Sequence, residues 1–352
     1  MNGTTAVAMC TLALGASLAA QTGPLDTSAA VPAAFFTASE SGLQFVLRAQ
    51  NRDGSWGDEP GAPGDLGNTA WAAMSLLALG HTPTRGQHAF AVRRAVDWLL
   101  YHTRGFDVNP PQFRMGTLLQ RKLGKNADLY LTCLGYTQLI GMNVDASDDD
   151  RMRAELSGMC RAIASLQKPT GDWETSYEPM LTTVLAWLAL KQSAAVGVAI
   201  QNASPQKVID YLRRASLEAA TGVFKDPHWG NNERFVTQGG GMRVFYGSDL
   251  GRSDEMHRAR DVVLRMRFDQ DVGGRQGGEE FLGAVFATQA LFLDGGEPFD
   301  QWYQKIGKAL LACQNKDGSW TGHHCITGRV FCTAASIMVM RMPDRLLPMC
   351  ER

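Results

Sequence analysis

The sequence lacks any excess of charge of one sign. Its 34 Lys and Arg residues are balanced by 35 Asp and Glu residues, which gives a formal net charge of −1 at pH 7. The charged residues are scattered, so no basic surface for nucleic acid or an anionic membrane is expected. The chain also lacks an apolar run of the roughly 20 residues that a membrane-spanning helix needs. These absences favour an ordinary globular protein, and a hydrophobic content of 45% is enough for a sizeable core.

An apolar stretch near the N-terminus, AVAMCTLALGASLAA at 6–20, is too short to span a bilayer but has the length of a secretory h-region. Small residues at 17–20 suit cleavage, although no Lys or Arg precedes the stretch. We therefore predict a signal peptide at 1–20, a linker at 21–37, one domain at 38–342 and a C-terminal tail at 343–352. The mature chain is expected in the periplasm or outside the cell, and a frayed apolar N-terminus is the alternative.

Cysteine is scarce, with seven residues in the chain. Cleavage after residue 20 would remove Cys10 and leave Cys133, Cys160, Cys313, Cys325, Cys332 and Cys350. The sequence does not choose among the possible pairings of these six thiols. An oxidising compartment would favour disulfides, and reduced thiols in the core are the alternative.

A phrase that is present three times, Q-x-x-x-G-x-W, organises the chain. It stands at Gln50, Gly54 and Trp56, at Gln167, Gly171 and Trp173, and at Gln314, Gly318 and Trp320. The copies start 117 and 147 residues apart, which corresponds to units of about 58 and 49 residues. Three further, degenerate units are therefore expected, one in the first interval and two in the second.

Each copy lies between two helix-like stretches. The stretch before it is amphipathic, as in MRAELSGMCRAIASLQ, and the stretch after it is apolar all round, as in EPMLTTVLAWLALK. Amphipathic helices cover one side of a fold, whereas uniformly apolar helices are buried. The pattern predicts an all-α fold of six helical hairpins in two concentric rings. The fourth inner helix, expected in GGGMRVFYGSDLG at 239–251, is the weakest because three glycines open it.

The residues of the repeated phrase favour a structural role. Gly after Asp53 or Asp317 suits a turn with positive φ. A Gln amide can bond open backbone groups at a helix end, and a Trp can fill the gap between neighbouring helices while its N–H finds an acceptor. We therefore expect the phrase to fasten adjacent outer helices together rather than to catalyse a reaction.

The phrase, with the aliphatic helix before it, resembles the QW repeat of squalene-hopene and oxidosqualene cyclases. The succession of helices is similar to the wider family of prenyltransferase and squalene-cyclase repeats. That resemblance covers nearly all of the expected mature chain and implies an (α/α)6 toroid. It implies little about activity, because the family includes cyclases, transferases and proteins that are not enzymes.

The motifs that carry chemistry in this family are missing here. Hopene-type cyclases protonate their substrate with Asp-x-Asp-Asp, whereas the nearest string is DASDDD at 145–150, which is expected to begin an outer helix. Protein prenyltransferases hold zinc with Asp and Cys at the start of an inner helix, where this chain reads Leu282-Gly283-Ala284. The Cys-Gly-Glu-Gln of thioester domains and the Asp-rich motif of diphosphate-ionising synthases are also missing. No metal or other cofactor is therefore expected.

The remaining candidate residues lie where the inner helices are expected to begin. If all inner helices start on one face, their positive dipole ends meet at one mouth and favour anionic groups. Candidate catalytic residues are Glu279, Glu280 and Asp226, because a buried carboxyl can act as a general acid. Candidate ligand-binding residues are His228, Arg234, Arg243, Tyr246, His323, His324 and Arg329. Asp65, Asp128 and Glu178 are expected at the same mouth without an assigned role; helix capping, exposed loops and plain core packing are the alternatives.

Three functions fit these observations. The first is an exported toroid without the family's catalysts that binds an apolar or isoprenoid-like ligand or a partner. The second is a divergent isoprenoid cyclase or transferase that uses a mouth carboxylate such as Glu280 as its acid. The third is a toroidal lyase or hydrolase that acts on a polysaccharide through Arg and His.

Overall fold

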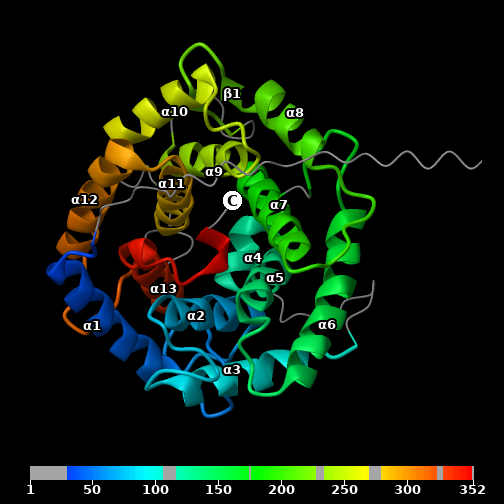
Figure 1. Cartoon of the computed structure of the whole chain (residues 1–352), viewed down its shortest axis with the longest axis vertical. Coiled ribbons are helices and arrows are strands. Elements are labelled where there is room, and N and C mark those ends of the chain that lie inside the picture. Colours follow the sequence, from blue (N-terminus) through cyan, green and yellow to red (C-terminus); the bar gives the residue numbers. More distant parts are fainter. Residues whose placement is uncertain are drawn as a thin grey trace, which may run out of the picture.

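The computed structural model describes residues 30–105, 116–173, 176–226, 234–268, 279–322 and 328–350. In this part of the chain the helices form a ring within a ring, and Figure 1 looks down the axis. The inner ring consists of α2 (Leu66–Ala78), α5 (Ala127–Leu139), α7 (Pro179–Ala195), α9 (Phe235–Tyr246), α11 (Glu280–Asp294) and α13 (Arg329–Met340). The outer ring consists of α1 (Ala33–Ala49), α3 (Ala89–His102), α6 (Ala146–Ser165), α8 (Pro205–Ala215), α10 (Asp254–Arg265) and α12 (Gly296–Ala312). The predicted toroid of helical hairpins is confirmed.

The two rings follow from the polarity of their helices. Outer α8 buries Val208, Ile209, Tyr211 and Leu212, whereas its other residues are partly or fully exposed. Inner α5 is buried along its whole length. Each inner helix packs against the next from α2 to α13, and α13 packs in turn against α2. The inner ring is therefore closed.

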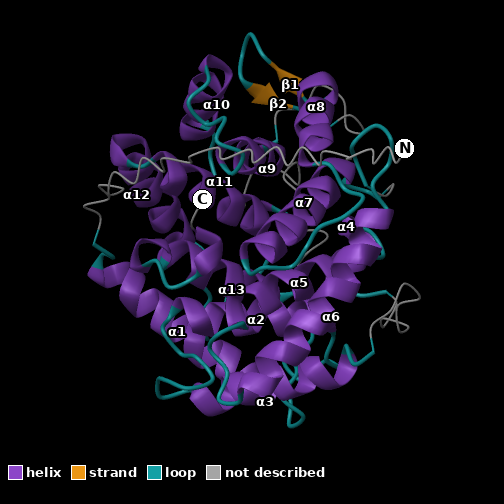
Figure 2. Ribbon diagram, turned by 45° about the vertical axis from the view of Figure 1, so that its right-hand side comes forward, coloured by secondary structure: helices purple, strands orange, loops and turns teal. Residues whose placement is uncertain are grey.

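Several short elements accompany the two rings. The helix α4 (Leu118–Leu123) packs on α5 and α7, and Figure 1 shows it close to the ring centre. The strands β1 (Leu217–Glu218) and β2 (Val223–Phe224) form an antiparallel hairpin after α8, drawn in orange in Figure 2. After α13 the chain passes through the 3-10 helices η1 (Met342–Asp344) and η2 (Pro348–Cys350), and the N–H of Met349 donates to Gln138 Oε1 at 2.8 Å. The segment expected as a tail thus contributes to the core.

The N-terminal expectations fall partly outside the described residues. The predicted signal peptide at 1–20 lies outside them, and α1 begins at Ala33, inside the expected linker. Among the described helices, none is both long and apolar enough to cross a bilayer.

The repeated phrase joins each outer helix to the next. The indole N–H donates to the preceding outer helix: Trp56 to the Val46 carbonyl at 2.8 Å, Trp173 to Ile163 at 2.7 Å and Trp320 to Leu310 at 2.8 Å. The Gln amide donates to the start of the following one: Gln50 to Ala91 at 2.9 Å, Gln167 to Ser204 at 3.1 Å and Gln314 to Ala38 at 2.9 Å. The glycines have φ of 96°, 101° and 90°, and a Cβ there would lie 2.1–2.4 Å from a backbone oxygen of the following helix. These contacts fasten adjacent outer helices together, as expected from the sequence.

The fourth unit builds the same fastener from residues that are not contiguous. Gly222, with φ of 75°, and Phe224 take the places of the Gly and the Trp, and Gln238 of α9 takes the place of the Gln. The Gln238 amide donates to the carbonyls of Gly222 at 2.9 Å and Ala259 at 3.0 Å, and its Oε1 accepts from the Phe224 N–H at 2.9 Å. Because the Gln comes from the inner helix, the phrase cannot be found by reading along the sequence.

The helix α9 differs from expectation in its register. It begins at Phe235, four residues before the expected start, so the three glycines lie in its interior. A Cβ at Gly239 would lie 2.7 Å from the Gly283 carbonyl oxygen of α11, and a Cβ at Gly241 would lie 2.3 Å from the Phe224 ring. Glycine is needed because α9 packs too closely on its neighbours for a side chain. The earlier start also moves Arg243 from the first turn of the helix to the last.

Candidate functional site

The N-termini of three inner helices meet at one end of the ring, which we call the mouth. Glu178, Arg234 and Glu279 are the N-cap residues of α7, α9 and α11, and Lys122 approaches them from α4. Lys122 Nζ lies 3.2 Å from Glu178 Oε1 and 3.1 Å from Glu279 Oε1. Arg234 donates to both oxygens of Glu178, at 2.6 and 2.8 Å, and lies 3.5 Å from Glu279. The mouth thus holds two cations and two carboxylates in one network.

This network is withdrawn from water. The side chains of Glu178 and Glu279 are 0% exposed, and those of Lys122 and Arg234 are 7% and 13% exposed. Buried ion pairs often cost as much in desolvation as they return in attraction, so such a network is weak evidence of a purely stabilising role. Burial raises the pKa of Glu279, and the neighbouring Glu178 raises it further against the attraction of Lys122 and Arg234. A carboxyl with a raised pKa among fixed charges is typical of functional sites.

A second buried carboxyl, Asp128, lies at the same end of α5. It is 1% exposed; Oδ2 accepts a hydrogen bond from Gln120 of α4 at 2.8 Å, and Oδ1 receives none from the described residues. Burial raises the pKa of Asp128 well above its usual range, and the nearby Asp65 and Asp58 raise it further. The surroundings of Asp128 therefore favour the protonated form of its carboxyl. From the sequence, Asp128 is expected at the mouth without a role, because nothing in its local sequence distinguishes it from a dipole partner.

The packing around Asp128 shows why its carboxyl is isolated. A Cβ on Gly67 of α2 would lie 2.6 Å from Asp128 Oδ1, so the carboxyl occupies space that a side chain at that position would fill. Asn68 holds the other two acids, donating to Asp58 at 3.0 Å and to Asp65 at 2.9 Å. The carboxyl is thus confined against the first turn of α2, with two acidic groups behind it.

The structure brings together only some of the predicted site residues. Asp226 joins the mouth: it is fully buried, accepts from the Met180 N–H at 3.4 Å and acts electrostatically on Arg234. Glu280 is buried but turns toward α13, where its charge raises the pKa of Cys332 and of Cys313, the latter to about 12; in both thiols burial is the larger cause. His228, His323 and His324 lie outside the described residues. In the described part of the chain, no three His, Cys, Asp or Glu side chains are arranged to hold a metal ion.

Three further predicted residues take no part in the charged network at the mouth. Arg243, expected there from the sequence, is fully buried in the last turn of α9, where it donates to Gln289 at 2.9 Å and to the Met349 carbonyl at 3.2 Å. Tyr246 ends the same helix, at the opposite end from Arg234. Arg329 is partly exposed and pairs with Glu59 at 2.7 Å and Asp317 at 2.9 Å.

Two aromatic residues of neighbouring inner helices, Trp71 and Phe331, are packed as core. Trp71 and Phe331 stack with ring centroids 5.0 Å apart and planes 7° from parallel, and each is 1% exposed. In the middle of the ring, a Cβ on Gly240 would touch Leu181 and Val184 of α7 at 3.4 Å. Side chains therefore fill the space between these inner helices.

No family model matches the chain, and no curated protein matches it in sequence. Several solved structures align with the chain over most of its length. Type II terpene cyclase MstE from Scytonema, in complex with the product merosterolic acid A, aligns with a TM-score of 0.55 at 15% identity over 89% of this chain and 98% of that chain. A glycosidase in complex with glucose aligns with 0.55 at 13% identity over 90% and 98%. The GH76A alpha-1,6-mannanase from Salegentibacter sp. HEL1_6 aligns with 0.54 at 8% identity over 89% and 99%.

At these identities the likeness shows the fold alone. The chain folds as an (α/α)6 toroid, similar to those of a terpene cyclase and of glycosidases. This confirms the fold that the resemblance of the repeated phrase implied.

Proposed function

We propose that this protein is an enzyme that carries out acid–base chemistry on an apolar, isoprenoid-like small molecule at the mouth of the ring. The observation that carries the proposal is the contrast between the surroundings of two buried carboxyl groups. Burial and the nearby Asp65 and Asp58 raise the pKa of Asp128, whereas Glu178 accepts two hydrogen bonds from Arg234 at 2.6 and 2.8 Å. A carboxyl with a raised pKa can donate a proton, and acid–base chemistry needs such a donor near carboxyl groups in a different environment.

Each group at the mouth has a role in this proposal. Asp128 is the proton donor. Glu279 is the proton acceptor, since its raised pKa makes it a stronger base, while the adjacent Lys122 and Arg234 favour its ionised form. Lys122 and Arg234 also orient the carboxylates, and Glu178 fixes Arg234. Glu280, the acid suggested by the sequence, acts electrostatically on Cys313 and Cys332 and is given no role in this proposal.

The substrate class is inferred from burial. The carboxyls of Glu178 and Glu279 are buried, at the ends of inner helices whose buried side chains are mostly apolar. Such a site favours an apolar small molecule over a water-soluble polymer, which needs an open groove. The toroidal neighbour MstE has been solved with geranylgeranyl dihydroxybenzoate as its substrate, which supports the isoprenoid class.

The test is turnover of isoprenoid compounds by the purified chain. The protein would be incubated with a lipid extract and with geranylgeraniol, and the products separated by mass spectrometry. We expect a product with wild-type protein and none with Asp128→Asn, which keeps the shape and neutrality of the protonated acid but cannot donate its proton. Arg329→Gln, at a surface ion pair, is the matched control and should retain turnover. Binding of the isoprenoid without turnover would instead support a toroid that has lost catalysis.

Glycoside hydrolysis is a second candidate, favoured by the spacing of the two glutamates. Their Oε1 atoms are at most 6.3 Å apart, because both contact Lys122 Nζ, at 3.2 and 3.1 Å. This bound admits the carboxyl separation of about 5–5.5 Å in retaining glycosidases and lies below the roughly 6.5–9.5 Å of inverting ones. Release of sugar from manno-oligosaccharides that is lost in Glu279→Gln, with no isoprenoid turnover, would select this function over the first.

A further inference from the structure

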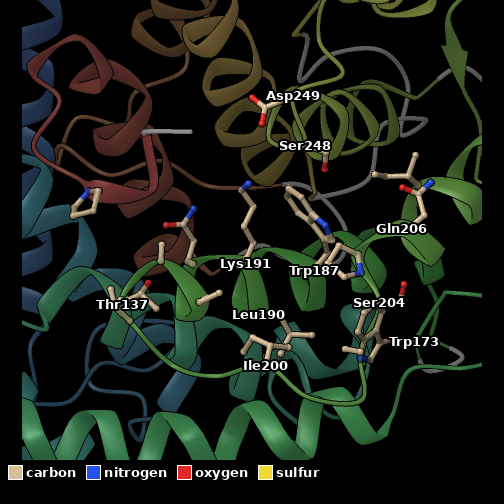
Figure 3. A pocket seen from close by; sticks show the side chains of 18 residues that line it. Thr137, Trp173, Trp187, Leu190, Lys191, Ile200, Ser204, Gln206, Ser248 and Asp249 are labelled. Atoms are coloured by element: carbon tan, nitrogen blue, oxygen red, sulfur yellow. The ribbon is translucent and has the colours of Figure 1, made fainter. Parts of the chain in front are cut away.

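A pocket of about 790 Å³ opens at the end of the ring opposite the mouth. It is bounded by the last turns of α7, the start of α8, the turn after α9 and Pro348 of the final segment, and Figure 3 shows the lining side chains. Thirteen residues of α7 separate Glu178 from Lys191 in this pocket, a rise of roughly 20 Å. The pocket is therefore distinct from the proposed catalytic groups, and the ligand it would bind does not depend on the proposed function.

Size and lining make the pocket suitable for a small molecule with an apolar body. Its volume falls within the roughly 300–1,000 Å³ that is usual for small-molecule sites. The apolar lining residues are Trp173, Trp187, Leu190, Ala194, Ala195, Val196, Ile200, Ala203, Pro205, Ile209 and Pro348. The remaining lining residues are polar and include one cation, Lys191, and one acid, Asp249. A mostly apolar lining with some polar groups suits a ligand whose hydrocarbon is buried and whose orientation is fixed by its polar end.

Lys191 supplies the distinctive polar group. In Figure 3 its side chain extends into the pocket beside Trp187, and its ammonium lies 5.6 Å from the centre of the Trp187 ring. No carboxylate of the described residues comes within 4.0 Å of this ammonium. Burial and the neighbouring Arg243 both lower the pKa of Lys191, whereas Asp249 raises it. Within the described part of the chain, the half-buried cation therefore lacks a direct counter-ion.

The surroundings of Lys191 add further positive charge to the pocket. A Cβ on Gly247 would lie 2.4 Å from Arg243 Nη1 and 2.7 Å from Trp187 Cη2, so the buried guanidinium lies within 5.1 Å of the indole. The positive end of α8 also borders the pocket through Pro205 and Gln206. Asp249 is the only acidic residue among those that line the pocket, and it is exposed at the edge.

We infer that this pocket binds an amphiphile with an apolar body and a monoanionic head group, such as a long-chain carboxylate. The head group pairs with Lys191 and the body lies against Trp187, Leu190 and Ile200. A single ammonium matches a single negative charge, and a cationic or uncharged head would leave Lys191 without its counter-ion.

The inference is tested by titrating the purified full chain with dodecanoate, below its micelle concentration, in an isothermal calorimeter at pH 7.5. We expect dodecanoate to bind saturably with one equivalent per chain. Dodecanol and dodecyltrimethylammonium should each bind at least ten-fold more weakly than dodecanoate. Lys191→Met should weaken dodecanoate at least ten-fold and leave dodecanol unchanged. Lys207→Met, on the exposed first turn of α8, is the matched control and should bind like wild type.

A second variant locates the ligand. Ala194→Trp places a large ring in the pocket from an exposed helical position, so it should fold and abolish binding. The inference is overturned if Lys191→Met binds dodecanoate as tightly as wild type, if Ala194→Trp leaves binding intact, or if the three amphiphiles bind equally. Absence of dodecanoate binding at millimolar concentration would overturn it too, and none of these results bears on turnover at the mouth.

Discussion

The side-chain amide of Gln314 donates a hydrogen bond to the Ala38 carbonyl at 2.9 Å and so joins the last outer helix to the first across 276 residues. Arg48 of α1 adds a bond to the Asp317 carbonyl of the same turn at 3.0 Å. The ring is thus closed by the same fastener that joins neighbouring units elsewhere. Because closure needs both ends of the chain, damage at this junction should lower the stability of the whole ring.

Replacing Gly318 by Ala should destabilise the protein by roughly 3 kcal/mol. The residue has φ of 90°, and the added Cβ would lie 2.4 Å from the Ser41 backbone oxygen. Gly61→Ala is the matched control, because φ there is 77° but no atom lies within 4 Å. Gly61→Ala should lower the free energy of unfolding by only about 1 kcal/mol. Urea unfolding followed by circular dichroism measures both, and equal losses would contradict the importance of the close approach.

Replacing Gln238 by Leu should cost roughly 3 kcal/mol, since it leaves the Phe224 N–H and the carbonyls of Gly222 and Ala259 buried without this partner. Gln206→Leu, whose amide bonds exposed Asp210, should change the free energy of unfolding by less than about 0.5 kcal/mol. The same urea titration compares the two. A Gln238→Leu protein as stable as wild type would mean that the fourth unit has no fastener.

The fold was predictable because its signals are local. A helix that is apolar all round, or apolar on one side, can be recognised from a dozen residues, and the repeated phrase marks the boundaries between hairpins. The fourth unit is hidden because its Gln238 lies on α9, away from Gly222 and Phe224 in sequence. The glycines of α9 resemble a helix start, although they are in the interior to allow close packing, and this difference in register is why Arg243 is expected at the mouth.

The site was less predictable because its residues meet only in three dimensions. Lys122 comes from α4, a helix too short to show a periodic pattern, and it contacts residues 56 and 157 positions further along the chain. The protonation of Asp128 depends on burial and on Asp65 and Asp58 from another unit. Neither the contacts of Lys122 nor the raised pKa of Asp128 can be recognised from the neighbouring residues in the sequence.

Asp128→Asn should become progressively more stable than wild type as the pH rises above about 4. The folded-state pKa of Asp128 is raised, so the folded protein holds a proton that the unfolded chain releases, and wild-type stability falls with pH until that pKa is passed. Asp128→Asn has no carboxyl at this position, so its stability should not fall for this reason as the pH rises. Thermal unfolding from pH 4 to pH 9 measures the difference between the two proteins.

Asp145→Asn serves as the control, because its difference in stability from wild type should depend on pH in the opposite direction. Hydrogen bonds from Ser147 lower the pKa of Asp145, so its contribution is present at neutral pH and is lost as the pH falls through that pKa. This variant should be less stable than wild type at pH 7, and the gap should close below pH 4. A constant offset between Asp128→Asn and wild type across the pH range would contradict a protonated Asp128.

Export of the chain, which we propose from the apolar stretch at 6–20, would expose its thiols to oxidation. Cys133 of α5 and Cys160 of α6 are reduced in the structure and hydrogen-bond each other. We expect the chain secreted from a native-like host to begin near residue 21 and to carry a Cys133–Cys160 disulfide, detected by N-terminal sequencing and peptide mass mapping. The bond closes a loop of 28 residues and should add on the order of 3 kcal/mol. An intact N-terminus with both thiols reduced would contradict export.

Lys122→Met should destabilise the protein by about 3–5 kcal/mol at pH 7.5, because Glu178 and Glu279 would lose the cation they share in a site without water. The loss should shrink at pH 4.5, where Glu279, whose pKa is already raised, takes up a proton. Adding Glu279→Gln removes the uncompensated charge and should recover part of the stability. Lys168→Met breaks the exposed pair with Asp172 and should cost less than about 1 kcal/mol. If Lys122→Met costs no more than this control, the mouth is open to water and its carboxyls do not have the dry environment that the proposed acid–base chemistry requires.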